Sequence, residues 1–188
     1  ANRHPRVNIL QPGCGVGGHC IAVDPWFIVD KSPERARLIK MAREVNDGKP
    51  IFVAQKLSEM LFAYLNKNPS ASMSSVKVAC YGMAFKPNID DMRESPSLVL
   101  IESLQSMGAS VDYHDEFLPE IPHSREHESL AGLKSVLLSK ENLGSYDAVL
   151  ISTNHSYISY QELADNSLLI LDTRNAMKYV TGNAIIIK

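Results

Sequence analysis

The chain has 188 residues, 45% of them hydrophobic, and a formal net charge of -2 from 19 basic and 21 acidic side chains. This length allows one sizeable core, or one domain with an appended helical arm. The sequence has no block of one charge sign and no apolar run near the roughly 18 residues of a membrane helix, so we expect neither a nucleic-acid surface nor a membrane span.

The cysteine count indicates the cellular compartment, and the first residues indicate how much of the whole protein this chain represents. Three cysteines, Cys14, Cys20 and Cys80, are an odd number without metal-ligand spacing. This usage indicates a reducing compartment, and we expect a cytoplasmic protein with no metal site. The sequence begins at Ala1 and shows no secretory signal. We therefore expect part of a longer chain, with an N-terminal portion absent.

A glycine-rich stretch, GCGVGGHCIAVDPW, carries the best candidate nucleophile. It follows residues 1–11, where we expect an exposed basic turn. Residues without a Cβ let the backbone approach a ligand closely. Backbone N–H groups or cations near a cysteine favour the thiolate, which is the reactive form. We therefore expect Cys20 to be nucleophilic. The alternative is that Cys20 is a small buried hydrophobic residue, as free cysteines often are.

The same stretch matches G-x-G-x-x-G through Gly13, Gly15 and Gly18, the fingerprint of a dinucleotide-binding turn. That fingerprint requires a preceding strand and a helix that opens at the third glycine. Here only VNIL precedes it, and Pro25 stands where the helix should run. On that context we reject a dinucleotide site at this loop.

Two helices are predicted next. Ser32-Pro33 is a capped helix start, and apolar residues then recur at helical spacing until Asn46-Asp47-Gly48 ends the run. Pro50 opens a second helix, which continues to Leu65 and is apolar on nearly all sides from Met60 onward. Such a helix must be covered, either by a partner subunit or by the following domain.

A polar linker, NKNPSASMSS at 66–75, marks the predicted domain boundary. Residues 1–68 would be a helical region with the cysteine loop, and 69–188 an α/β domain. In that domain we expect strands at 76–82, 110–115, 147–152, 168–172 and 183–187, with helices at 95–107 and near 160–164. This order predicts an α/β fold in which a helical arm precedes an open, mostly parallel Rossmann-like sheet.

Polar side chains follow several of the predicted strands. In open parallel sheets ligands bind at the carboxyl ends of the strands. The residues there are Phe85, Lys86, Asp90, Asp91 and Arg93, then Thr153, Asn154 and His155, then Thr173 and Arg174. Lys86, Arg93 and Arg174 together would suit a diphosphate. The alternative is that Lys86 and Arg93 pair with Asp90 and Asp91 on the surface.

Four motifs, GCGVGGHCIAVDPWF, REVND, YGMAFKPNIDDMRESPS and LDTRN, resemble in this order those of the UDP-glucose/GDP-mannose dehydrogenase family. The likeness is greatest to bacterial members that oxidise UDP-N-acetyl-D-mannosamine. It covers all 188 residues and corresponds to the end of the family's central region and its last domain. The resemblance implies an NAD-dependent oxidation of a UDP-sugar C6 alcohol to a carboxylate, with two NAD+ reduced, and a homodimer formed through the central helical region.

The resemblance also implies roles for individual residues. Cys20 would attack the C6 aldehyde and carry a thiohemiacetal and then a thioester, and Asp24 would position or activate water. Arg93 would reach the NAD phosphates. Residues implied in UDP-sugar binding are Gly13, Gly15, Gly17, Gly18, Phe85, Lys86, Arg174 and Arg6, the last either within the chain or across the dimer.

Some features depart from the family pattern or leave the function open. Cys14 and Ala22 replace prolines that are frequent in the family, and we expect them to loosen the loop. A lysine and an asparagine of the family's catalytic set would lie upstream with the NAD domain, so we expect this chain alone to be inactive. Two alternatives remain: another UDP-sugar, UDP-N-acetylglucosamine or UDP-glucose, because motifs common to the family do not separate epimers, or a non-catalytic UDP-sugar-binding or dimerisation module.

Overall fold

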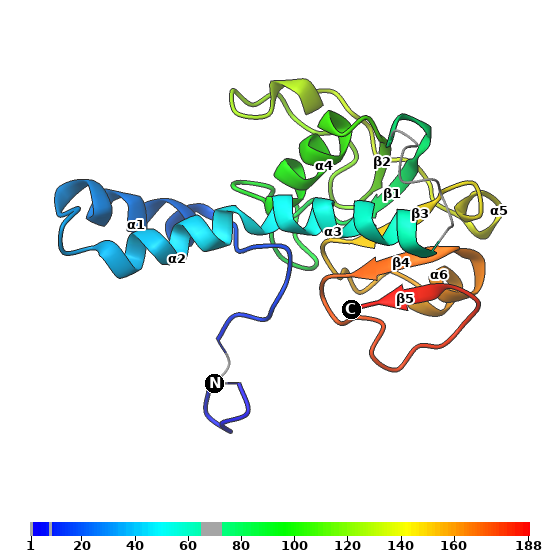
Figure 1. The fold of residues 1–188 in the computed structure, drawn as a ribbon, viewed down its shortest axis with the longest axis horizontal. Helices are drawn as coiled ribbons and strands as arrows, with labels where there is room; N and C mark the ends of the chain where they lie inside the picture. Colours follow the sequence, from blue (N-terminus) through cyan, green and yellow to red (C-terminus); the bar gives the residue numbers. More distant parts are fainter. Residues whose placement is uncertain (1, 8, 65–72) are drawn as a thin grey trace.

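The computed structural model describes residues 2–7, 9–64 and 73–188. A helical arm extends from an α/β domain (Figure 1). Helices α1 (His19–Lys31) and α2 (Arg37–Asp47) lie side by side in the arm, and α3 (Lys49–Tyr64) runs from the arm onto the domain (Figure 1). The predicted boundary at 68/69 and most of the predicted linker lie outside the described residues.

The domain is built on a five-stranded sheet in the order β2-β1-β3-β4-β5. Every neighbouring pair of strands is parallel. The strands are β1 (Lys77–Tyr81), β2 (Ser110–His114), β3 (Ala148–Ile151), β4 (Leu169–Asp172) and β5 (Ile185–Ile187). The predicted open parallel Rossmann-like sheet is therefore confirmed, with each strand within one or two residues of its expected position.

Helices cover both faces of the sheet. Val78 and Cys80 of β1 belong to a buried cluster with α3 and α4 (Pro96–Ser106). Ala79 and Tyr81 belong to a second cluster with α5 (Lys140–Leu143) and α6 (Tyr160–Asn166). Short 3-10 turns lie at Met73–Ser75 and Glu128–Leu130. Because both faces are buried, the central strands are continuous apolar runs rather than alternating ones.

Helix α3 is covered mainly by its own chain. Leu57, Met60 and Leu61 are buried in the cluster that includes α4. Tyr64, at the end of the helix, is 54% exposed. Of the two alternatives for this helix, burial against the following domain is therefore correct for Met60 and Leu61, whereas Leu65 lies outside the described residues.

Two helix predictions for the arm were wrong. Helix α1 runs through Pro25, which we expected to prevent a helix. Proline cannot donate to the carbonyl four residues earlier, but Arg43 Nη1 of α2 donates to that Ile21 carbonyl at 3.3 Å. Helix α2 begins at Arg37 rather than at Pro33, because Ser32 caps the C-terminal end of α1 with its N–H on the Ile28 carbonyl at 3.0 Å.

Candidate functional site

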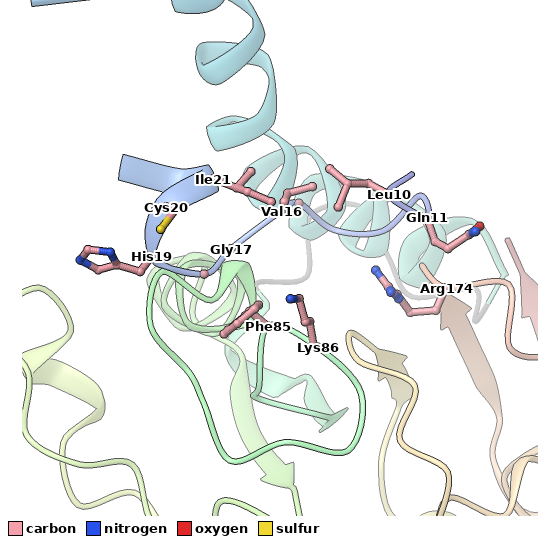
Figure 2. A pocket seen from close by; sticks show the side chains of 12 residues that line it. Leu10, Gln11, Val16, Gly17, His19, Cys20, Ile21, Phe85, Lys86 and Arg174 are labelled. Atoms are coloured by element: carbon pink, nitrogen blue, oxygen red, sulfur yellow. The ribbon is translucent and has the colours of Figure 1, made fainter. Parts of the chain in front are cut away.

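The site lies where the strand order reverses, between β1 and β3. Crevices at such positions, beyond the carboxyl ends of the strands, are where open α/β sheets bind ligands. The loop after β1 and the loop after β4 face the glycine-rich stretch across a cavity of about 320 Å³ (Figure 2). Its lining comprises Leu10, Gln11, Gly15, Val16, Gly17, Gly18, His19, Cys20, Ile21, Phe85, Lys86 and Arg174.

Cys20 is exposed and lines this cavity. It is the second residue of α1, directly after the N-cap Gly18 and His19. Unpaired backbone N–H groups and the positive end of the helix dipole gather at such a position and favour negative charge there. The alternative that Cys20 is a buried hydrophobic residue is therefore wrong, whereas Cys14 and Cys80 are both buried.

The glycines allow two parts of the chain to meet. A Cβ at Gly17 would overlap the Glu94 carbonyl oxygen, and Gly18, at φ 88°, packs against the Phe85 ring and donates its N–H to the Arg93 carbonyl at 3.0 Å. Gly13 lies against the Arg174 guanidinium but does not line the cavity. Close approach within the protein therefore accounts for these glycines, and ligand contact by Gly15, Gly17 and Gly18 stays a prediction.

Two of the three predicted cations meet at the cavity. Lys86 lies over the Phe85 ring, 5.1 Å from its centre. Arg174 donates from Nε to Asn154 Oδ1 at 3.1 Å, and its backbone N–H is held by Asp172 Oδ1 at 2.9 Å. Cys20 and Arg174 stand at opposite ends of the cavity, with Lys86 between them (Figure 2). The carboxyl-end rule therefore found the cationic wall of the cavity.

Arg93 differs from these two cations. It forms an ion pair with Asp91 at 2.6 Å, as the surface-pairing alternative predicted, and this guanidinium holds the pKa of Asp91 below its usual value. Arg93 lines a neighbouring cavity of about 250 Å³ that shares His19 with the first. Of the two or three cations expected to converge at this edge, Lys86 and Arg174 line the first cavity and Arg93 does not.

Two other predicted residues lie outside the cavity lining. Asp24 is exposed on α1, four residues after Cys20 and so one helical turn along the same face. Arg6 is exposed in the N-terminal segment, which hangs away from the α/β domain (Figure 1). Within one chain the structure does not bring Arg6 to the cavity, and a contribution across a dimer stays a prediction.

Cys14 ties the glycine-rich stretch to the loop after β3. Its Sγ lies 3.0 Å from Ser152 Oγ, which in turn lies 2.5 Å from Ser97 Oγ. Burial raises the pKa of the Cys14 thiol, so the sulfur stays neutral. Ala22 is also buried, inside α1. Both side chains thus pack into the interior, and a looser loop relative to the proline-bearing relatives stays a prediction.

Asn46 is a site residue that the sequence reasoning missed. Its Oδ1 accepts the Val16 N–H at 2.9 Å, and its Nδ2 donates to the Val16 carbonyl at 3.3 Å. We read Asn46 only as the end of a helix, although it belongs to the REVND motif. The amide therefore ties α2 to the stretch that presents Cys20.

In the described ranges, no group of three or more His, Cys, Asp or Glu side chains could hold a metal ion. Across those same ranges, no helix is both long and apolar enough to cross a membrane.

Fold and site together define a Rossmann-like α/β domain whose cationic cleft faces a thiol on a helical arm. Residues 79–179 match the UDP binding domain of the UDP-glucose/GDP-mannose dehydrogenase family. Residues 1–48 match the central domain of the same family. The chain belongs to this family.

Similar curated proteins are sugar-nucleotide dehydrogenases, and several of them share one name. A UDP-N-acetyl-D-mannosamine dehydrogenase of Campylobacter jejuni is 48% identical over 156 residues, which cover 82% of this chain and 35% of that protein. The Escherichia coli K12 enzyme of the same name is 46% identical, covering 83% and 36%. An NDP-N-acetyl-D-galactosaminuronic acid dehydrogenase of Ralstonia solanacearum is 42% identical, covering 93% and 38%.

Solved structures agree with the fold. A UDP-D-ManNAc dehydrogenase from Pyrococcus horikoshii superposes with a TM-score of 0.76 at 29% identity, covering 99% of this chain and 41% of that one. The UDP-N-acetyl-mannosamine dehydrogenase Cap5O from Staphylococcus aureus gives 0.70 at 32% identity, covering 99% and 41%. The chain thus spans between about a third and two fifths of the length of these relatives.

Proposed function

We propose that this chain is the C-terminal part of an NAD-dependent dehydrogenase that oxidises the C6 alcohol of UDP-N-acetyl-D-mannosamine to a carboxylate, with Cys20 as nucleophile. The observation that carries the proposal is the exposed Cys20 thiol at a helix N-terminus, in a cavity shared with Lys86 and Arg174. A thiol can form a covalent bond to the C6 carbon of the sugar, and two cations can bind the diphosphate. One cavity therefore offers both functions that such a substrate requires.

Cys20 takes part in the second oxidation, from aldehyde to carboxylate. Its thiolate adds to the C6 aldehyde carbon and forms a thiohemiacetal, and loss of hydride from C6 then leaves a thioester. Water adds to the thioester carbon, and the C–S bond breaks to release the carboxylate and the thiolate. Asp24, one turn along α1, accepts a proton from that water. Lys86 and Arg174 hold the diphosphate, so the sugar extends toward Cys20.

The cofactor has one candidate contact among the described residues. The Arg93 side chain is 66% exposed, and its charge interacts with Cys20. Asp91 already shares its guanidinium, and no strand precedes the glycine-rich stretch within the described part of residues 7–18. These residues fit a single contact to the cofactor diphosphate rather than a whole dinucleotide site. NAD+, bound by the parent enzyme, would accept the two hydrides.

The first experiment tests the nucleophile in the full-length parent enzyme. Cys20→Ser should abolish net oxidation to the carboxylate, because a hydroxyl is a far weaker nucleophile at neutral pH. NADH production with UDP-N-acetyl-D-mannosamine is the measurement. The control is Lys140→Ala, an exposed change on α5, at the opposite end of the molecule from α1 (Figure 1). Turnover like that of the wild type in Cys20→Ser would contradict the role of Cys20 as nucleophile, whereas a wild-type parent that produces no NADH with any UDP-sugar would favour a non-catalytic binding module.

The second experiment tests the substrate. The same assay with UDP-N-acetyl-D-mannosamine, UDP-N-acetylglucosamine and UDP-glucose should give the highest kcat/KM for the mannosamine sugar, since the most similar relatives above carry that name. A higher value for another sugar would replace the substrate but keep the reaction. The isolated 188-residue chain should produce no NADH, and steady production by it would contradict the division of the active site between this chain and an upstream NAD domain.

A further inference from the structure

The loop that carries Phe85 and Lys86 is fastened near both ends by two buried side chains. At its start, Asp115 Oδ2 accepts the Met83 N–H at 2.7 Å. At its end, His155 Nδ1 lies 2.9 Å from the Asn88 N–H. The two anchors are joined, because His155 Nε2 lies 3.1 Å from the same Asp115 Oδ2. One connected pair therefore holds the loop on either side of its two cavity residues.

The hydrogen bonds define the state of the histidine. The Asn88 backbone N–H can only donate, so His155 Nδ1 must be the unprotonated acceptor. The proton then sits on Nε2, which donates to Asp115. The remaining Asp115 oxygen, Oδ1, accepts the Phe117 N–H at 2.9 Å. Through its two ring nitrogens, His155 thus connects the Asp115 carboxylate to the Asn88 end of the loop.

Burying Asp115 and His155 costs free energy, which indicates that their hydrogen bonds are needed. His155 is 0% exposed and Asp115 1%. A buried carboxylate costs free energy unless it is well hydrogen-bonded, and an apolar pair of similar size often serves stability equally well. The imidazole is enclosed by the rings of Phe117 and Tyr157, each 5.3 Å from its centre. Its surroundings therefore fix both its position and its orientation.

The Asn88 end of the loop has a second fastening. Asn88 has φ 61° and is exposed, and its Oδ1 accepts the Ser156 N–H at 2.8 Å. Ser156 follows His155 directly, so both contacts tie the loop from β1 to the loop from β3. Lys86 and Phe85, between the two anchors, have no such backbone tie to Asp115 or His155 among the described hydrogen bonds.

We propose that Asp115 and His155 are positioning residues that set the Met83–Asn88 loop so that Phe85 and Lys86 meet the nucleotide diphosphate. The inference rests on the proposed function, in which those two residues contact the UDP-sugar. Neither Asp115 nor His155 lines the cavity, so both act through the loop backbone.

Two substitutions of His155 separate its two hydrogen bonds. In His155→Asn, Oδ1 is the same number of bonds from Cβ as Nδ1 and can still accept the Asn88 N–H. In His155→Gln, Nε2 is the same number of bonds from Cβ as the histidine Nε2 and can still donate to Asp115. The Asn variant should keep slow hydrogen exchange at the Asn88 amide, and the Gln variant should lose it.

The binding readout uses UDP as the probe and calorimetry on the 188-residue chain. His155→Gln should weaken UDP binding by about tenfold, and His155→Asn by less, because a neutral hydrogen bond accounts for up to about a factor of ten. In the parent enzyme, KM for the UDP-sugar should rise by more than kcat falls, since Cys20 sits on a different segment. Partial rescue by Asn over Gln distinguishes positioning from general loss of packing.

A variant outside the interior guards against misfolding. Asn88→Gly keeps the backbone N–H at a φ that glycine adopts freely and removes only the exposed contacts to Ser156. It should weaken UDP binding in the same direction. Unchanged UDP affinity in His155→Gln and Asn88→Gly, or unchanged Asn88 exchange in His155→Gln, would overturn the inference. A wild-type chain that binds no UDP would instead contradict the proposed function, while the exchange rates alone decide whether the pair fixes the loop.

Discussion

Cys14 and Cys20 stand six residues apart in one glycine-rich stretch, yet their surroundings give them opposite chemistry. Cys14 is 2% exposed, hydrogen-bonded to Ser152 and kept neutral by burial. Cys20 is exposed at the start of α1. The turn at Gly17 and Gly18 separates the two, since it directs one thiol inward and the other to the cavity.

This contrast predicts selective alkylation of the folded chain. Iodoacetamide should modify Cys20 and leave Cys14 and Cys80 unmodified, because both are buried and burial raises the pKa of each thiol. Mass spectrometry of peptides after brief treatment is the measurement. All three should react in denaturant, and Cys20→Ser should take up no label when folded. Labelling of Cys14 at a rate equal to that of Cys20 would contradict the assigned roles.

Asp115 makes stability depend on pH. Burial acts to raise its pKa, but hydrogen bonds from His155 and the Met83 N–H outweigh burial and leave the pKa below its usual value. A carboxyl group whose pKa is lowered by folding stabilises the fold above its unfolded pKa of about 3.9, and the contribution is lost as pH falls through the lower, folded value.

The corresponding measurement is Tm between pH 6 and pH 3 for the wild type and Asp115→Asn. The wild type should lose more Tm below about pH 4 than the variant does, because only the wild type must protonate this group. The variant, compared with itself across pH, serves as its own reference for any constant loss of stability. Equal pH dependence in the two proteins would contradict the direction given for Asp115.

At the scale of the helices and strands, agreement with prediction depended on how local the cause is. The strands were predictable because each is a short apolar run bounded by turn residues, and α4 because Ser95 caps it and Gly108 follows it. Helix α1 was not predictable, since the carbonyl freed by Pro25 finds its donor in Arg43 of the next helix. Only the folded hairpin brings that donor close.

The candidate site divides in the same way. Lys86 and Arg174 follow from strand order alone, because parallel strands end at one edge. The Cys14–Ser152 contact joins residues 138 apart, and the Asn46–Val16 contact joins residues 30 apart. No sequence pattern around Cys14 or Asn46 predicts a partner so far along the chain. Arg93 also follows β1, but it pairs locally with Asp91 and does not line this cavity, which strand order alone does not predict.

The two hydrogen bonds between the Asn46 amide and the Val16 backbone predict that removing this side chain loosens the glycine-rich stretch. Asn46→Ala should lower the free energy of unfolding by about 1–3 kcal/mol, because the partly buried Val16 peptide loses both of these hydrogen bonds. It should also change the alkylation rate of Cys20, which lies on the same stretch. Urea unfolding and iodoacetamide labelling measure the two effects. Glu44→Ala, which removes only an exposed pair with Lys40, should change neither by a comparable amount.

Considered as a whole, the molecule places the thiol and the cations on different bodies. Cys20 belongs to the arm, and Lys86 and Arg174 belong to the α/β domain. The glycine-rich stretch meets the domain where Gly17 and Gly18 pack against Glu94 and Phe85, and the Asn46 side chain ties α2 to that stretch. The distance between nucleophile and diphosphate therefore depends on how firmly the arm is held, and any contact that immobilises the arm contributes to the site.

The arm exposes an apolar stripe that predicts such a contact. Helix α2 has no buried residue, and Leu38, Met41 and Val45, which share one face at helical spacing, are 82%, 57% and 66% exposed. Residues 1–48 match the family's central domain, the region through which the resemblance implies a homodimer. We expect a second copy of the chain to cover this stripe, because burying each large apolar side chain contributes about 1.5–3 kcal/mol.

Light scattering over a range of concentrations tests this expectation. The wild-type chain should reach twice its monomer mass, and the double variant Leu38→Glu/Val45→Glu should remain monomeric, because two charges would be buried without partners. Lys40→Ala, an exposed change on the same helix, should dimerise like the wild type. Two results together would contradict this expectation: a wild-type chain that stays monomeric, and a parent enzyme whose assembly does not change when it carries the double variant. They would show that an upstream segment, rather than a second copy, covers the stripe.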